Sequence, residues 1–323
     1  MSVGPEFPET PLSIAYSPCP NDTFVFHAWA HGLIPGAPPI DVTFADIDIT
    51  NGLLGNGRGL DVMKISYAAL PDALEEYELL PCGGALGRGC GPLVLVAGHE
   101  KPGGADGLGG PIDSGPIDSG LDSEPALPSA PLSAPSDSLP SPLSAADLAG
   151  RTVAVPSLKS TAYLLFQRWV ERELPGGTAA LGEVRVLPFH EIMPAVRAGT
   201  ADAGLVIHEA RFTYPGFGLT ALADLGEWWE QTTGAPIPLG AIVARRSLGA
   251  AAIAQLTEVI RASVKHAFAH PEASRAYVMA HAQEMDPEVA KAHIGLYVNE
   301  FTVDLGPEGL AAVELLLNGY ASS

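Results

Sequence analysis

One histidine stands where an α/β protein would carry a chemically active side chain. The stretch "GLVIHEAR" is an apolar run, 204–207, followed at once by His208 and Glu209. An imidazole titrates near neutral pH and can accept a proton during catalysis. If 204–207 is a strand, His208 lies at its carboxyl end, where open α/β sheets bind ligands. His208 is therefore either a general base or a histidine satisfied by a loop carbonyl, and position alone leaves both interpretations open.

Three junctions between an expected strand and an expected helix carry polar residues that could bind an anion. They are "SPCPNDTF" with Asn21, "MKISYAALP" with Lys64 and Ser66, and "VPSLKSTAY" with Ser160. The start of a helix presents N–H groups without intrahelical partners at the positive end of the helix dipole, so it attracts a carboxylate. The alternative is ordinary N-capping, which stabilises a helix by about 1 kcal/mol. Lys64, at the expected end of its strand, either pairs with an anion or reaches solvent.

Other chemistries have less support in the sequence. Cys19 lies at the first junction, where a helix start would stabilise a thiolate, but the sequence shows no partner base. His27 and His31 have a spacing that can bind metal, yet neither an HExxH motif nor a third ligand accompanies them, so no metal site is predicted. Four further histidines are expected on ordinary helix faces: His266, His270, His281 and His293.

Composition excludes several partners. The 323 residues include 17 Lys+Arg against 37 Asp+Glu, a net charge of −20, which argues against binding to a nucleic-acid backbone. Three cysteines without a CxxC pair fit neither a disulfide framework nor a zinc site. The N-terminal stretch lacks the features of a signal peptide, and the apolar runs are shorter than a membrane span. We expect a soluble cytoplasmic protein with no membrane partner, and the sequence does not indicate its oligomeric state.

Strand-like and helix-like patterns alternate along most of the chain, which favours an α/β fold with mostly parallel sheets. Two nearly continuous apolar strands, 92–97 and 237–245, would carry the chain from one lobe to a second and back. The expected first lobe is 1–97 plus 240–323 and the second is 98–239, with a ligand cleft between them.

One segment, 101–145, differs from the rest of the chain. It consists largely of Gly, Pro, Ser, Ala and Asp and repeats "GPIDS" in tandem. Such a composition cannot bury enough apolar surface to offset its ordering entropy, so we interpret it as a flexible surface insertion.

Several long motifs taken together resemble one enzyme family. "SPCPNDTF", "KISYAALP", "GGALGRGCGPLV", "GLVIHEARFTYPGFGL" and "LGEWWEQTTGAPIPLGAIVARR" are similar to the 1,4-dihydroxy-6-naphthoate synthase family of the futalosine route to menaquinone. The resemblance covers nearly the whole chain except 101–145 and the extreme N-terminus. It implies a type II periplasmic-binding-protein-like fold used as a cytosolic carbon–carbon lyase. The implied reaction cleaves cyclic dehypoxanthinyl futalosine to 1,4-dihydroxy-6-naphthoate and a sugar-derived fragment, with no metal or organic cofactor.

The resemblance also implies a site. The histidine of "VIHE", His208, would be the proton acceptor. The substrate, a small carboxylate, would be bound by the following residues: Lys64, Ile65, Ser66, Ser160, Thr161 and Asn21. Two alternatives stay open, a non-catalytic binding protein for a small carboxylate and a related dehydratase of the same pathway on the same fold.

Overall fold

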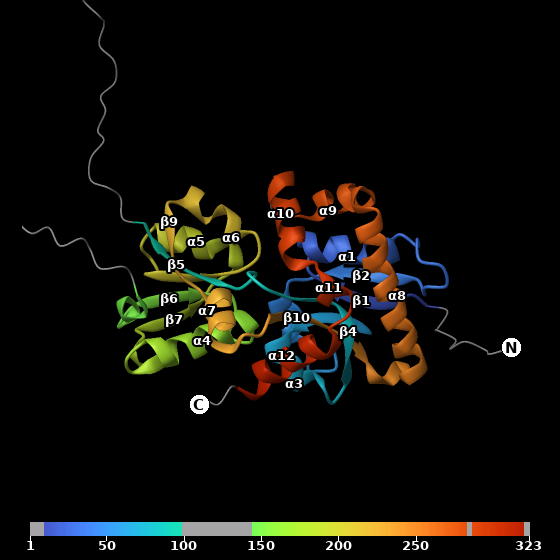
Figure 1. Cartoon of the computed structure of the whole chain (residues 1–323), viewed down its shortest axis with the longest axis horizontal. Helices are drawn as coiled ribbons and strands as arrows, with labels where there is room; N and C mark the ends of the chain where they lie inside the picture. The colour runs from blue at the N-terminus through green and yellow to red at the C-terminus, as the bar shows by residue number, and fades with distance from the viewer. Residues whose placement is uncertain (1–9, 99–143, 283–285, 320–323) are drawn as a thin grey trace, which may run out of the picture. The chain divides into compact units, whose positions relative to one another are not determined.

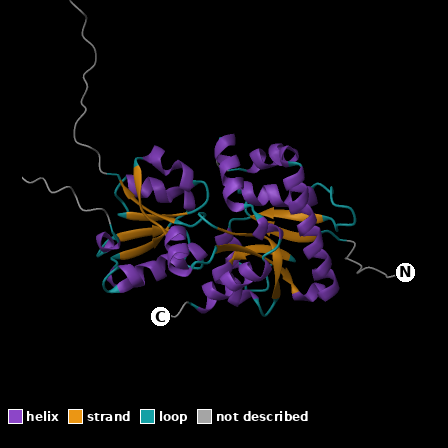
Figure 2. Cartoon of the chain, viewed as in Figure 1, coloured by secondary structure: helices purple, strands orange, loops and turns teal. Residues whose placement is uncertain are grey.

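The computed structural model describes residues 10–98, 144–282 and 286–319. These residues form two five-stranded sheets, and Figure 2 shows helices on both faces of each sheet. The predicted insertion, 101–145, lies outside the described residues except for its last two positions. Among the described residues, no helix is long and apolar enough to cross a membrane.

The first sheet has the strand order β2-β1-β3-β10-β4; Figure 1 labels β1, β2, β4 and β10. Its strands are β1 (Leu12–Tyr16), β2 (Ile40–Phe44), β3 (Val62–Ser66), β4 (Tyr77–Gly87) and β10 (Ile237–Arg245). β1 runs parallel to both β2 and β3, whereas β10 runs antiparallel to β3 and β4. The sheet is therefore mixed, because β10 returns to it from the second sheet.

The helices of this part include a central helix that is buried on every side. They are α1 (Pro20–Ala30), α2 (Ile47–Gly52), α3 (Leu70–Ala73), α8 (Ala250–Ala269), α9 (Arg275–His281), α10 (Pro287–Tyr297), α11 (Glu300–Val303) and α12 (Gly306–Asn318). α1 contacts α8, α9 and α10, and its residues from Pro20 to Trp29 are all buried. A helix covered on all sides needs no polar face, which explains the apolar sequence "FVFHAWA".

The second sheet repeats the pattern of the first, with the order β7-β6-β8-β5-β9. Its strands are β5 (Leu93–Ala97), β6 (Thr152–Val155), β7 (Glu183–Val186), β8 (Ala203–Val206) and β9 (Leu219–Asp224), and its helices are α4 (Thr161–Glu173), α5 (Phe189–Arg197), α6 (Ala210–Thr213) and α7 (Leu225–Thr233). β6 is parallel to β7 and β8, and β5 is antiparallel to β8 and β9.

The expectation of mostly parallel sheets is therefore wrong in one respect, since each sheet contains two antiparallel pairings. We also did not expect β4, because its glycine-rich end is typical of a loop.

Gly84 shows why a strand carries glycine here, because a Cβ at this position would lie 2.5 Å from the carbonyl oxygen of Gly240 on β10. Only glycine allows the two strands to approach so closely. The residue boundaries given above for two lobes stay predictions.

Candidate active site

A pocket gathers side chains from the first sheet and from segments that adjoin the strands of the second. Of the predicted site residues, six line it: Asn21, Lys64, Ser66, Ser160, Thr161 and His208. Most of the other lining residues are apolar, among them Ile47, Leu239 and Tyr297. The pocket holds about 520 Å³ of empty space, part of it open to solvent. An apolar cavity with a few convergent polar groups is the usual form of a small-molecule site.

His208 stands in a strained turn just after β8. Its φ is 54°, the one positive value of a non-glycine residue among those described. Side chains with a Cβ seldom adopt this left-handed conformation, and such strain is concentrated at functional sites. The half-buried ring lies edge-on to Phe189 with ring centroids 5.7 Å apart, and no described residue hydrogen-bonds to its nitrogens. The imidazole is therefore free to exchange a proton with a molecule in the pocket.

The start of α4 forms another wall of the pocket. Ser160 is the N-cap, and its hydroxyl accepts a hydrogen bond from the Tyr163 N–H at 3.2 Å, which confirms the predicted cap. The Thr161 hydroxyl donates to the Leu239 carbonyl at 3.0 Å and accepts from the Ala68 N–H at 3.2 Å. Both hydroxyls therefore form hydrogen bonds within the protein. The first-turn N–H groups, which have no intrahelical acceptor, are the donors of this segment that remain for a ligand.

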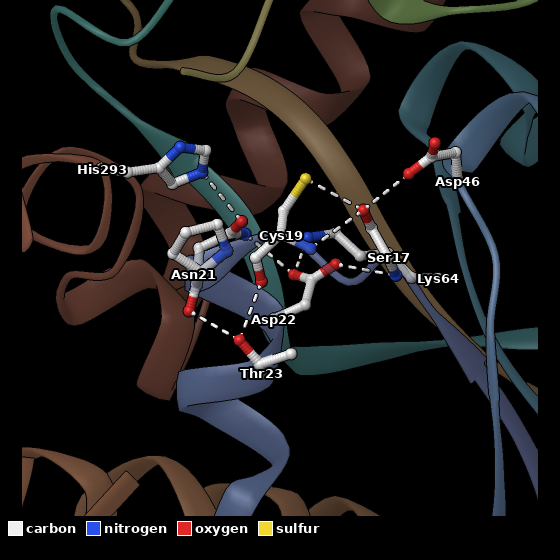
Figure 3. A network of polar contacts seen from close by, with 9 residues as sticks. Ser17, Cys19, Asn21, Asp22, Thr23, Asp46, Lys64 and His293 are labelled. Atoms are coloured by element: carbon white, nitrogen blue, oxygen red, sulfur yellow. Dashed lines mark hydrogen bonds and ion pairs between the residues drawn. The ribbon is translucent and has the colours of Figure 1, made fainter. Parts of the chain in front are cut away.

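Lys64 does not stand at the end of β3, as expected, but in its middle. Its ammonium group forms a buried ion pair with Asp22, as Figure 3 shows. The same carboxylate accepts from the Asn21 side-chain amide at 2.8 Å and from the Ser17 N–H at 3.3 Å. Asp22 thus neutralises Lys64, in place of the two partners considered from sequence, a ligand anion and solvent.

Ser66 and Ile65 follow Lys64 on the strand and point to opposite faces. The Ser66 N–H donates to the Asn51 side-chain oxygen at 2.9 Å, and the Asn51 amide donates back to the Ser66 hydroxyl at 3.0 Å. Ile65 is fully buried in the apolar core and does not line the pocket. Its side chain does not reach the pocket, so the predicted substrate contact at this position stays a prediction, one that only the main chain could make. The period-two alternation along a strand already contained that information.

His293, which was expected on an ordinary helix face, instead lies in the interior beside the candidate site residue Asn21. It lies on α10, is completely buried, and its Nε2 is 3.0 Å from Asn21 Oδ1. Burial, with the nearby charges of His208 and Lys64, holds its pKa well below the ordinary value. The buried residues Ala290, His293 and Tyr297 repeat at helical spacing, and this pattern was the available signal.

Cys19 corrects another expectation. It is the N-cap of α1 but is buried, and its Sγ accepts from the Ser17 hydroxyl at 3.0 Å. Burial raises the pKa of the thiol well above the ordinary value. The helix start therefore does not produce a thiolate here, because desolvation outweighs the dipole.

A second, more polar pocket adjoins the first. Its lining includes Asp46, Asp48, His190 and Glu209, and it shares His208 with the first pocket. His208 therefore stands on a wall common to an apolar and a polar compartment.

This architecture defines the class of protein. Two mixed α/β sheets with a ligand pocket make a periplasmic-binding-protein-like fold, as predicted. The periplasmic aliphatic sulphonate binding protein SsuA of Escherichia coli superposes with a TM-score of 0.60 at 15% identity, over 97% of this chain and 86% of that one. Protein AF1704 of Archaeoglobus fulgidus gives a TM-score of 0.73 at 26% identity, over 95% of both chains.

Sequence relatives narrow the class to a family. A family model described as "Menaquinone biosynthesis" matches residues 12–105 and 137–322. A protein of Streptomyces coelicolor named 1,4-dihydroxy-6-naphtoate synthase is 58% identical, over 96% of this chain and 93% of its own. A protein of the same name from Thermus thermophilus is 40% identical, over 94% and 92%. The chain belongs to this menaquinone-biosynthesis family, and the resemblance drawn from its motifs is confirmed.

Proposed function

We propose that this chain is a cytoplasmic carbon–carbon lyase that converts cyclic dehypoxanthinyl futalosine to 1,4-dihydroxy-6-naphthoate, with His208 as general base and no metal or organic cofactor. One observation carries the proposal: His208 lines both pockets, and no described residue forms a hydrogen bond with its ring nitrogens. The names of the two relatives supply the product.

The substrate carboxylate binds at the start of α4 in this proposal. Ser160 caps the helix and Ala162 lines the pocket, so the first-turn N–H groups of Thr161 and Ala162 are the nearest backbone donors. A helix N-terminus favours an anion through these donors and its dipole. The apolar side chains of Ile47 and Leu239 then pack against the ring system.

The reaction begins when His208 removes a proton from the carbon beside a ketone. The electron pair of that C–H bond forms an enolate, whose collapse breaks the carbon–carbon bond to the sugar-derived fragment. Formation of the aromatic naphthoate favours the product. Lys64 gives one N–H to Asp22 and has two more to donate to the enolate oxygen, since an ammonium group has three donors.

The test is turnover by the purified protein. Cyclic dehypoxanthinyl futalosine is added, and 1,4-dihydroxy-6-naphthoate is followed by absorbance and mass spectrometry. We expect steady formation by the wild type and a kcat lower by about 10²–10⁴-fold for His208→Asn, the range of a general base. Asparagine tolerates the left-handed backbone of position 208 better than alanine does, so it removes the base without adding strain.

The matched control is His270→Asn, an exposed histidine at the end of α8, for which we expect the wild-type rate. Binding without naphthoate formation by the wild type would replace the lyase by a binding protein. A wild-type rate in His208→Asn would remove the base assignment.

A further inference from the structure

We propose that Glu209 and His293 share one proton, and that Glu209 delivers this proton to the departing fragment. Glu209 would thus be a second catalytic residue, and His293 would position and hold its proton. The catalytic role rests on the proposed lyase function, whereas the shared proton does not.

The two side chains face each other as buried acceptors. Glu209 Oε2 and His293 Nδ1 are 3.9 Å apart, and neither atom has a hydrogen-bond partner among the described residues. His293 is 0% exposed and Glu209 is 9% exposed. Buried polar atoms are normally satisfied, so this facing pair requires an explanation.

The tautomer of His293 follows from its other contact. The Asn21 amide nitrogen donates to Asp22 Oδ1 at 2.8 Å, which fixes the orientation of the amide. Asn21 Oδ1 can then only accept, so the proton of the neutral His293 ring lies on Nε2, 3.0 Å away. Nδ1 is left with a lone pair, 3.9 Å from Glu209 Oε2.

Two lone pairs in a desolvated space repel each other, and a single proton between them converts repulsion into a hydrogen bond. The atoms need to close by only about 1 Å to reach ordinary hydrogen-bond distance. Whether the proton rests on the carboxyl or on the imidazole, the pair is neutral overall, and neutral groups tolerate burial better than an isolated charge.

The surroundings favour a neutral pair. On the His293 side, burial comes first, and then His208 and Lys64 lower its pKa. On the Glu209 side, burial above all raises the pKa of Cys19 and of Tyr297, so both stay neutral and neither adds a charge beside the carboxyl group. Of the other charged groups near the pair, Asp22 is paired with Lys64 and Arg211 with Asp224. Asp46, which also lines the polar pocket, accepts a hydrogen bond from the Ser17 hydroxyl. One proton on the pair is therefore the arrangement that leaves no buried charge uncompensated.

The reaction needs such a group for its proton balance. His208 takes one proton when the C–H bond breaks, and the fragment leaves with the electron pair of the broken carbon–carbon bond. That pair must receive a proton. Glu209 lines the polar pocket beside His208, where the sugar-derived fragment would lie. A carboxyl group held protonated by His293 supplies that proton, and the pair regains one afterwards from His208 through the solvent of the pocket.

The decisive variant is Glu209→Gln. Glutamine keeps the shape and can donate an amide N–H to His293 Nδ1, so folding is preserved, but it cannot release a proton. We expect kcat to fall by about 10²-fold or more, with KM within a few-fold of wild type. The rate of the wild type falls at high pH as the shared proton is lost, and this alkaline limb should be absent from the variant.

The control is Glu308→Gln, an exposed carboxylate paired with Arg88, which should leave rate and pH profile unchanged. If Glu209→Gln keeps the wild-type kcat, or loses rate while the alkaline limb persists, the proposal is overturned, because a merely structural role would give the latter result.

A second measurement reads the pair without turnover. In protein labelled with ¹⁵N-histidine and free of substrate, we expect His293 Nδ1 to show a strong hydrogen bond that disappears in Glu209→Ala. A free lone pair at Nδ1 in the wild type would overturn the shared proton. If the wild type makes no naphthoate but Nδ1 is hydrogen-bonded, the lyase function fails and the shared proton stands.

Discussion

Lys64 and Asp22 allow a quantitative test of what holds the site together. Their side chains are 8% and 1% exposed, and they form an ion pair between β3 and the first turn of α1. Removing one partner of a buried pair leaves the other charge desolvated and uncompensated, which costs about 3–5 kcal/mol of unfolding free energy. We therefore expect Lys64→Met to lose that amount. At about 2 °C per kcal/mol for a domain of this size, the melting temperature should fall by roughly 6–10 °C.

The double variant Lys64→Met with Asp22→Asn decides whether the loss comes from the orphaned charge. Asparagine retains an oxygen that can accept from Ser17 and Asn21, while no charge stays buried. The double variant should therefore be more stable than Lys64→Met alone, since replacing both members of a buried pair is often nearly neutral.

The assay is a double-mutant cycle by urea and thermal unfolding. The matched control is Arg246→Met, which breaks an exposed ion pair with Glu78, both side chains being 47% exposed, and should cost no more than about 1 kcal/mol. If Lys64→Met costs no more than the control, or if the double variant is no more stable than Lys64→Met, the pair does not support the fold in this way.

Two further predictions concern α4 and the cysteines. Ser160→Ala removes the hydrogen bond that caps α4 at the Tyr163 N–H, so it should lower the free energy of unfolding in urea by about 1 kcal/mol. Because the first turn of α4 would fray, the variant should also have a higher KM. An unchanged KM would mean that the cap does not contribute to substrate binding. The three cysteines are buried. Burial raises the pKa of Cys82 and of Cys90 to about 12 and that of Cys19 well above its ordinary value. A thiol reagent at pH 8 should therefore label no cysteine before the protein unfolds. Stoichiometric labelling of the native protein would contradict this burial.

The sequence predicts local features of this protein well, because they depend on neighbours in the chain. A strand followed by Ser160 and an amphipathic run is enough to place the start of α4. His208 was found for the same reason, since "GLVIHE" shows both the strand and its end. The same local logic places the Ile65 side chain on the face of the strand opposite those of Lys64 and Ser66.

The rest depends on contacts between distant segments. Asp22 meets Lys64 from 42 positions away, and His293 reaches Asn21 across 272 positions. The spacing of Ala290, His293 and Tyr297 indicates which face of α10 is buried, but not that this helix packs against α1. β5 and β10 lie in the two apolar runs that were expected as strands, but a pattern of alternating strands and helices does not show that they pair antiparallel to their neighbours.

The proposed mechanism assigns binding and chemistry to different elements. The donors proposed for the anion belong to the start of α4, whereas the groups proposed to exchange protons, His208 and Glu209, follow β8. A helix N-terminus binds an anion whatever the residues after β8 are, so a fold of this class needs only a titratable turn beside its ligand to become an enzyme. The strained backbone of His208 fits that reasoning, because a binding wall has no need of an imidazole held at a φ of 54°. We therefore expect His208→Asn to bind the substrate with the affinity of the wild type but to lose turnover. Equilibrium binding of the substrate to this variant measures the affinity directly. A loss of affinity as large as the loss of turnover would mean that His208 also binds the substrate in its ground state.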